Sequence, residues 1–134
     1  MKSQVIVNQK TKQIMCTAHG KGREHDFKLF KRSKTHLLEP TSCLGDKGYQ
    51  GIQKIHKESN TPHKKPIKGK LSKEQKQQNR QLASTRIIIE HIYRNLKIFR
   101  ILSERYRNRK KRFALRFNLI AGIYNHELCL SQSF

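Results

Sequence analysis

The sequence predicts an α/β fold, and three patterns lead to that class. Two short segments of apolar and β-branched residues, 3–8 and 13–18, flank a polar turn and predict a β-hairpin. A third short apolar segment at 42–44 predicts another strand. Two stretches with apolar residues at helical spacing, from 72 to about 99 and from about 107 to 128, predict long helices. Strands and helices mixed along one chain in this way are typical of an α/β domain.

Two short helices are predicted on either side of the third strand. Residues 24–26 open the first of them, which carries Phe27 and Phe30 three positions apart. Acidic residues in this first turn favour the helix because they face the positive end of its dipole. After the third strand, a turn bordered by glycines leads into a second brief helix that carries Ile52 and Ile55.

The second half of the chain predicts a basic loop and then the two long helices. Residues 57–70 are rich in lysine and contain two prolines and one glycine, which predicts a loop with room for a short strand around 66–67. Ser72 and Gln75 form a capping-box pattern at the start of the first long helix. The predicted apolar stripe of that helix comprises Leu82, Ile89, Ile92, Tyr93, Leu96 and Phe99. The stripe of the second comprises Phe113, Phe117, Ile120, Tyr124 and Leu128, and its start is basic.

Composition points to a polyanionic partner. The chain has 134 residues, enough for one domain with a modest core, and 34% of them are hydrophobic. Thirty Lys and Arg against nine Asp and Glu give a net charge of +21. Nucleic acid suits such a charge because every neutralised phosphate releases counterions. The alternative is a charge that only solvates the surface, but surface charge normally mixes both signs.

No segment predicts export or membrane insertion. The start of the chain does not resemble a signal peptide, and no apolar run approaches the length of a membrane span. Three widely spaced cysteines without a C-x-x-C pattern predict small buried residues in a reducing, cytoplasmic setting: Cys16, Cys43 and Cys129. A mixed zinc site with some of the histidines is the alternative. The lone histidines His56, His63, His91 and His126 are expected on the surface or in loops.

Asp46 is the first of two acidic positions with a plausible chemical role in this basic chain. It follows the third strand and precedes Gly48, which lets a ligand or backbone approach closely. Catalytic groups often occupy loops at strand ends. The structural alternative is an aspartate that starts a turn or caps the next helix.

Glu90 is the second such position, midway along the first long helix. Arg86 precedes it by four residues and Lys97 follows it by seven, so the three share one helix face beside the apolar stripe. We expect Glu90 and Asp46 to converge on a shared divalent cation. The structural alternative is a weak surface pair between Arg86 and Glu90.

Taken together, these motifs resemble a known family. Cys43-Leu44-Gly45-Asp46-Lys47-Gly48-Tyr49 resembles the second-Asp motif of bacterial insertion-sequence transposases of the DDE type. Arg86-x3-Glu90-x6-Lys97 resembles their Glu motif, and residues 94–102 and 22–27 fit the same family. The resemblance covers about residues 3–128 and implies an RNase H-like fold.

The sequence departs from the family pattern at two places. Ala83 stands where the fuller Glu motif has a tyrosine. The first Asp of the family's triad would lie on a strand before the hairpin, where this sequence has none. The resemblance therefore implies a C-terminal portion, with residues 1–134 forming a truncated RNase H-like domain whose first strand is missing. Asp26 could stand in for the absent acid, although its place in a helix's first turn has a structural explanation.

The resemblance also implies roles for individual residues. Asp46 and Glu90 would be catalytic and would hold Mg²⁺ or Mn²⁺, with Arg86 orienting Glu90. Lys97 would contact a phosphate near the transposon end, while Arg94 and Arg100 would contact the DNA backbone within a basic surface spanning 54–80 and 94–116. With one carboxylate missing, the chain alone is expected to bind DNA but cut it slowly or not at all. An N-terminal transposase half, or a second copy of the chain, would be its protein partner.

Two other functional classes remain open on the sequence alone. A non-catalytic, basic nucleic-acid-binding protein would explain the charge, but gives no reason for the contexts of Asp46 and Glu90. A degenerate relic without function would expose a sheet edge and aggregate in isolation. Divalent-metal binding that depends on Glu90 separates the transposase interpretation from the others.

Overall fold

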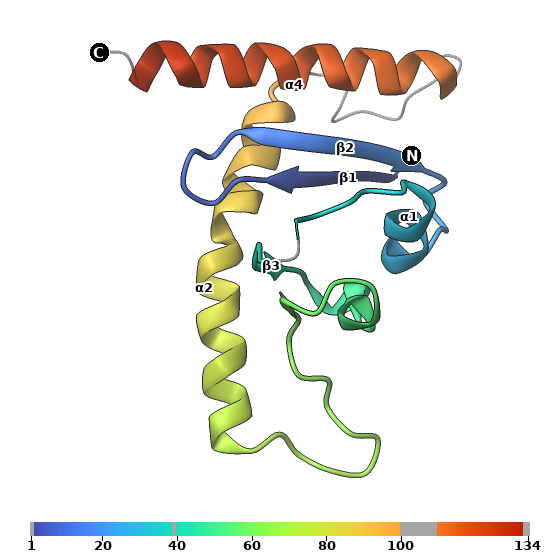
Figure 1. Cartoon of the computed structure of the whole chain (residues 1–134), viewed down its shortest axis with the longest axis vertical. Helices are drawn as coiled ribbons and strands as arrows, with labels where there is room; N and C mark the ends of the chain where they lie inside the picture. Colours follow the sequence, from blue (N-terminus) through green and yellow to red (C-terminus); the bar gives the residue numbers. More distant parts are fainter. Residues whose placement is uncertain (1, 39, 100–109, 133–134) are drawn as a thin grey trace. The chain divides into compact units, whose positions relative to one another are not determined.

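A computed structural model describes residues 2–38, 40–99 and 110–132, with the side chains of 110 and 111 left out. The described part of the chain forms two compact units. One comprises Met1–Glu24 with Ile88–Phe134, and the other comprises His25–Ile87. Figure 1 labels the helices and the strands β1 to β3. The α/β class expected from the sequence is confirmed.

The first unit contains the predicted hairpin. Strands β1 (Lys2–Val7) and β2 (Ile14–Gly20) pair antiparallel, with an irregularity between Ile6 and Val7 (Figure 1). The turn between them is held by the side chain of Asn8, which accepts the backbone N–H groups of Lys10 at 2.9 Å and Thr11 at 3.1 Å. An asparagine that bonds its own following backbone is a common way to start a turn.

The core of this unit lies between the hairpin and two long helices, α2 (Lys73–Leu96) and α4 (Lys110–Gln132). Its buried members are Ile14, Ile92, Leu96, Phe113, Phe117, Ile120 and Ala121. The stripe predicted for the second helix is thus confirmed at its first three positions, and Tyr124 is partly buried against them. Helix α2 ends at Leu96 rather than near 99, and the side chain of Phe99 is 42% exposed. That predicted core position is wrong because the regular helix stops one turn earlier.

Polar side chains fix the helices of the first unit to the hairpin. The hydroxyl of Tyr93 on α2 donates to the carbonyl of Ser3 at 3.0 Å. Asn125 on α4 accepts the N–H of Ile14 at 2.8 Å and donates to its carbonyl at 2.9 Å. The side chain of His19 on β2 lies edge-on to the rings of Phe113 and Phe117, with centroid separations of 5.4 and 4.8 Å.

Helix α4 also carries apolar side chains on its outward side. Leu115 and Leu119 are 71% and 64% exposed, and Ile123 and Leu130 are exposed as well. These positions recur at spacings of four and seven, so they form a second apolar row opposite the buried one. We refer to Leu115, Leu119, Ile123 and Leu130 as the outer row of α4. Among the described helices, none is long and apolar enough to cross a membrane.

The second unit contains the short elements. Helix α1 (Asp26–Arg32) begins after His25 and buries Leu29 and Phe30. Strand β3 (Cys43–Leu44) is followed by two 3₁₀ turns, η1 (Lys47–Tyr49) and η2 (Ile52–Lys54). Strand β4 (Ser59–Asn60) then pairs parallel with β3 (Figure 1).

The basic loop differs from expectation in the position of its strand. The expected strand around 66–67 is wrong, because the residues that pair with β3 are Ser59 and Asn60. The N–H of Cys43 donates to Glu58 at 2.8 Å, and that of Gly45 donates to Asn60 at 2.9 Å. The capping box at the far end of the loop is confirmed. Ser72 accepts the N–H of Gln75 and Gln75 accepts the N–H of Ser72, both at 3.1 Å.

Cysteine burial corrects a further expectation, and one histidine is more buried than most loop residues. Cys16 and Cys129 are exposed rather than buried, and Cys129 accepts a hydrogen bond from the Gln13 side chain at 3.1 Å. Cys43 is half-buried, and burial raises the pKa of its thiol. His56 is in a loop, as expected, and is buried there with its Nε2 donating to the carbonyl of Thr41 at 2.5 Å.

Candidate functional site

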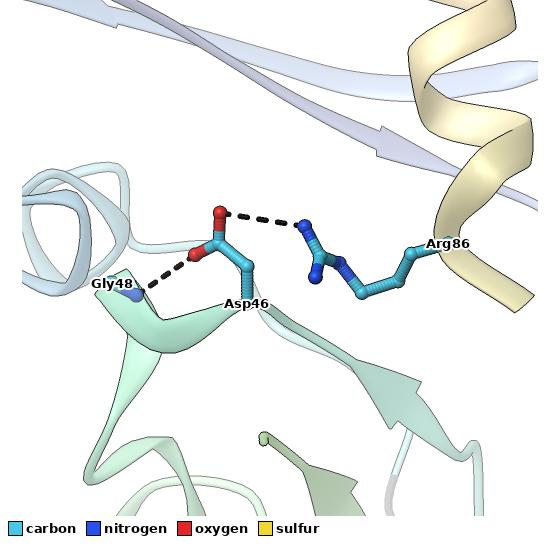
Figure 2. Close-up of polar contacts among 3 residues, drawn as sticks. All are labelled: Asp46, Gly48 and Arg86. Carbon is cyan, nitrogen blue, oxygen red and sulfur yellow. Dashed lines mark hydrogen bonds and ion pairs between the residues drawn. The ribbon is translucent and has the colours of Figure 1, made fainter. Parts of the chain in front are cut away.

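Asp46 lies directly after β3, at the strand end where the sequence placed it. Its Oδ1 accepts the N–H of Gly48 at 2.8 Å, so the side chain caps η1 (Figure 2). Its Oδ2 lies 3.5 Å from Nη2 of Arg86 on α2 (Figure 2). The side chain is 43% exposed and the Arg86 side chain 30% exposed. The capping role weighed as the structural alternative is therefore present, and one edge of the carboxylate still faces solvent.

Gly48 is needed for a close approach, and the approaching group is Asp26. A Cβ atom at Gly48 would lie 2.1 Å from Oδ2 of Asp26, a separation that no side chain tolerates. The rings of Phe30 and Tyr49 meet edge-on with centroids 6.4 Å apart. Helix α1 therefore packs against η1 through the residues that flank Asp46, and its first turn holds Asp26 as the structural interpretation expected.

Gly51 completes this packing. Its φ of 94° lies in the left-handed region, where residues with a Cβ are strained. A Cβ there would also lie 3.4 Å from the ring of Phe27. The segment from Asp46 to Gly51 is thus shaped by two glycines, each beside a residue of α1. Packing against α1 therefore supports the turn that carries the Asp46 carboxylate.

The Arg86–Asp46 pair changes the expected role of Arg86. The sequence placed Arg86 beside Glu90, one turn further along α2, whereas its guanidinium contacts Asp46. A pair this exposed contributes little stability, because solvent screens it. It does place a cation against the oxygen of Asp46 that does not cap η1. That Arg86 orients Glu90 stays a prediction.

Glu90 lies on the part of α2 that belongs to the first unit. It lines an open hollow of about 580 Å³ together with Tyr93, Arg94, Lys97 and Ile98. Three of the residues predicted to act on DNA, namely Glu90, Arg94 and Lys97, therefore share one surface. Arg100 lies outside the described residues. The predicted convergence of Glu90 with Asp46 on one cation stays a prediction.

The described residues do not by themselves provide a complete metal centre. Within residues 2–38, 40–99 and 110–132, no three His, Cys, Asp or Glu side chains are grouped so that they could hold an ion. The two oxygens of Asp46 contact the Gly48 amide and the Arg86 guanidinium instead. Hard divalent cations take several oxygen ligands, so Asp46 and Glu90 are too few. The same finding removes the mixed zinc site from this part of the chain.

Comparison with known proteins supplies the family. The model of the DDE superfamily endonuclease family matches residues 1–125. The chain belongs to this family. It is 60% identical over 130 residues to the "Probable transposase for insertion sequence element IS702" of Microchaete diplosiphon. The match covers 97% of this chain and 47% of that relative, so the chain spans about half of the relative's length. No solved structure matches the chain.

Membership confirms the resemblance drawn from the second-Asp and Glu motifs. The segments that carry the resemblance, 43–49 and 86–97, lie inside the residues of this DDE superfamily chain that the family model matches. Members of the superfamily generally use divalent metals. Sequence reasoning weighed the cap formed by Asp46 as the structural alternative, but it missed the approach of Asp26 to Gly48. The cap had a local signature, since Asp-x-Gly is a common turn pattern. The approach of Asp26 to Gly48 had none, because the two residues are far apart in the sequence.

Proposed function

We propose that this chain is part of an insertion-sequence transposase that cuts and joins DNA phosphodiesters, with Asp46 and Glu90 as two of its metal-binding carboxylates. The observation that carries the proposal is the position of Asp46. It is a partly exposed carboxylate fixed at a strand end, inside a segment matched by the DDE superfamily endonuclease family. Residues 1–134 would form one RNase H-like domain in this proposal.

The metal would be Mg²⁺ or Mn²⁺, because carboxylate oxygens are hard ligands that suit these ions. Such an ion polarises a phosphodiester oxygen and lowers the pKa of a bound water. Since Asp46 and Glu90 alone are too few, a further carboxylate would come from outside the described residues. A second polypeptide segment or another copy of the chain would supply it. The chain alone would therefore bind DNA but cleave it poorly.

Arg86 supports the assignment of Asp46. Its guanidinium lies 3.5 Å from Oδ2, so a cation already faces the oxygen that would ligate the metal. On metal binding we expect Arg86 to give up this contact, because two cations against one oxygen repel each other.

Arg94 and Lys97 would bind DNA phosphates. They line the same hollow as Glu90, so a phosphate held by the two cations would lie beside the carboxylate. Arg and Lys commonly fix a protein on DNA through phosphate oxygens without reading sequence. Arg100 keeps its predicted role as a further phosphate contact. The DNA substrate would be the transposon ends.

Manganese binding tests the assignment. The full chain would be titrated with Mn²⁺ and the bound fraction followed by electron paramagnetic resonance. We expect weak binding that is lost in both Asp46→Ala and Glu90→Ala. Glu74→Ala is the matched control, because Glu74 also lies on α2, in its first turn, and is exposed. Equal Mn²⁺ binding by all four proteins would contradict the proposal.

The charge of +21 favours a second candidate, a basic nucleic-acid-binding protein without catalysis. Both candidates predict DNA binding that weakens steeply with salt, so salt dependence does not separate them. Plasmid cleavage with Mg²⁺ does. Robust cleavage by the chain alone, abolished in Asp46→Ala, would exclude the second candidate and show that two carboxylates suffice.

A further inference from the structure

The basic loop between β4 and α2 (Figure 1) contains a turn at residues 66–69. The turn comprises Pro66, Ile67, Lys68 and Gly69, and its two ends touch. A Cβ at Gly69 would lie 3.5 Å from the Cβ of Pro66. The side chain of Ile67 is fully exposed, at 102% of its reference area. We refer to residues 66–69 as the apical turn.

Lysines surround the apical turn. Lys64, Lys65, Lys68 and Lys70 are all exposed, and the sequence has no Asp or Glu between Glu58 and Glu74. A single exposed apolar residue is ordinary on a protein surface. Here the exposed isoleucine lies among lysines, in a segment without acidic residues. A β-branched residue at a turn apex gains nothing from the fold, since turns favour Gly, Pro, Asn, Asp and Ser.

The base of the loop is fixed to the rest of its unit. The N–H of His63 donates to Oδ1 of Asn79 at 2.7 Å, and Nδ2 of Asn79 donates to the His63 carbonyl at 3.2 Å. Ring nitrogen Nε2 of His63 lies 2.6 Å from Oε1 of Gln78. The side chain of Gln50 donates to the carbonyl of Pro62 at 2.6 Å. The apical turn is therefore carried on a base that is tied both to α2 and to the segment after Asp46.

We propose that the apical turn enters the minor groove of duplex DNA, where Ile67 wedges between base steps while the flanking lysines bind phosphates. Proteins that kink DNA from the minor groove insert an apolar side chain in this way and hold the bent backbone with cations. The lysines provide sequence-independent attraction. The inference rests on the proposed function insofar as that function makes DNA the partner.

Duplex RNA fits the same surface less well. The minor groove of A-form RNA is wide and shallow, so a single side chain gains little by entering it. In B-form DNA the groove is narrow, and pyrimidine–purine steps unstack easily. A wedge should therefore act on DNA at such steps and leave an RNA duplex of the same sequence stacked.

The experiment uses the full chain, metal-free buffer and a short DNA duplex with 2-aminopurine at a central TA step, whose fluorescence rises on unstacking. We expect a rise with the wild type and none with Ile67→Ala, whose affinity falls roughly 3- to 10-fold through the lost apolar contact. Leu38→Ala is the matched control, since Leu38 is 78% exposed in the same unit and lies outside the basic surface. It should behave like the wild type.

A lysine variant distinguishes the effect of Ile67 on base stacking from the effect of the lysines on phosphate binding. Lys65→Ala should lower the slope of log affinity against log salt by about one, while the fluorescence rise at saturation remains. Ile67→Ala should leave the slope unchanged. An unchanged fluorescence rise in Ile67→Ala, or an equal rise with the RNA duplex, would overturn the inference. Neither result bears on Mn²⁺ binding by Asp46 and Glu90, so failure of the wedge and failure of the proposed function are distinguishable.

Discussion

Asp46 shows how one carboxylate can serve both the fold and a candidate site. Its Oδ1 bonds to the Gly48 amide and its Oδ2 faces Arg86, so different oxygens serve the turn and the cation. Packing of α1 fixes the turn that holds it. An acid in a chain of net charge +21 can therefore persist for structural reasons alone. The effect of Asp46 on the stability of the protein and its proposed metal binding must be measured separately.

Substitution of Asp46 by Asn separates the two roles. Asparagine caps about as well as aspartate, so Asp46→Asn should change the free energy of unfolding by less than about 0.5 kcal/mol. Asp46→Ala should cost about 1 kcal/mol, because the Gly48 amide loses its partner. Urea denaturation measures both changes. If Asp46→Asn destabilises as much as Asp46→Ala, the contact with Arg86 rather than the cap holds the turn.

Gly48→Ala tests the packing of α1 on this segment. The added Cβ meets Oδ2 of Asp26, so we expect a loss of about 1–3 kcal/mol in the free energy of unfolding. Gly48 is not among the described residues with positive φ, so steric contact alone is tested. The double variant with Asp26→Ala should recover part of the loss. Strictly additive changes in the double-mutant cycle would show that Asp26 is not the group that the Cβ meets.

His19 makes the stability of the first unit depend on pH. Burial lowers the pKa of His19 below 6.5, while a side-chain hydrogen bond with Asn118 acts in the opposite direction. Between the folded and unfolded pKa values the unfolded chain binds a proton that the folded chain does not. The free energy of unfolding should therefore fall as pH drops below about 6.5 and stay constant above about 7.5.

Denaturation at pH 7.5 and 5.5 measures this dependence, which should be smaller in His19→Gln than in the wild type. His126→Gln is the control, because His126 is exposed on the same helix that covers His19. The interpretation would be wrong if both variants kept the full wild-type pH dependence.

At the scale of elements, local patterns predicted the structure well and non-local pairings did not. The hairpin and the stripes of α2 and α4 were predictable because apolar periodicity is set by the element itself. The pairing of β3 with β4 was not, since two residues on each strand leave no period to recognise. Helix α2 was predicted about three residues too long, because Phe99 continues the spacing although the helix has ended.

In the candidate site, too, the positions of residues along their elements were predictable, whereas contacts between elements were not. Asp46 could be placed from a strand followed by a glycine. Spacing placed Glu90 and Lys97 on one helix face, although α2 ends at Leu96, just before Lys97. Arg94 came from the family resemblance. The contact of Arg86 with Asp46 was not predicted, because helix spacing indicates which residues share a face but not which other segment lies against that face. The contact of Asp26 with Gly48 is a tertiary contact between two motifs, so the sequence alone did not predict it.

Leu96, the last residue of α2, is the most buried of the described residues in this helix. Its side chain is 1% exposed, and we expect Leu96→Ala to cost about 2–5 kcal/mol in the free energy of unfolding. Phe99→Ala, three residues later and 42% exposed, should cost much less. Urea denaturation compares the two. Equal losses would mean that the apolar stripe extends past the end of the helix, as the sequence alone suggested.

At the scale of the whole molecule, the share of the relative that this chain covers bears on activity. The match spans 47% of the probable IS702 transposase, and the described residues lack a third ligand. In the proposed function, joining this chain to the unmatched portion of that relative should produce Mg²⁺-dependent plasmid nicking that the chain alone lacks. Asp46→Asn in the joined protein should abolish it. Nicking that survives this substitution would remove Asp46 from the site.

The outer row of α4 sets a limit on handling the protein. At low ionic strength the charge of +21 keeps copies apart, although each copy exposes Leu115, Leu119, Ile123 and Leu130. The Debye length shrinks from about 10 Å at 0.1 M salt to about 3 Å at 1 M, so concentrated salt removes this colloidal protection. The protein should therefore aggregate at the same high ionic strengths that release bound nucleic acid during purification.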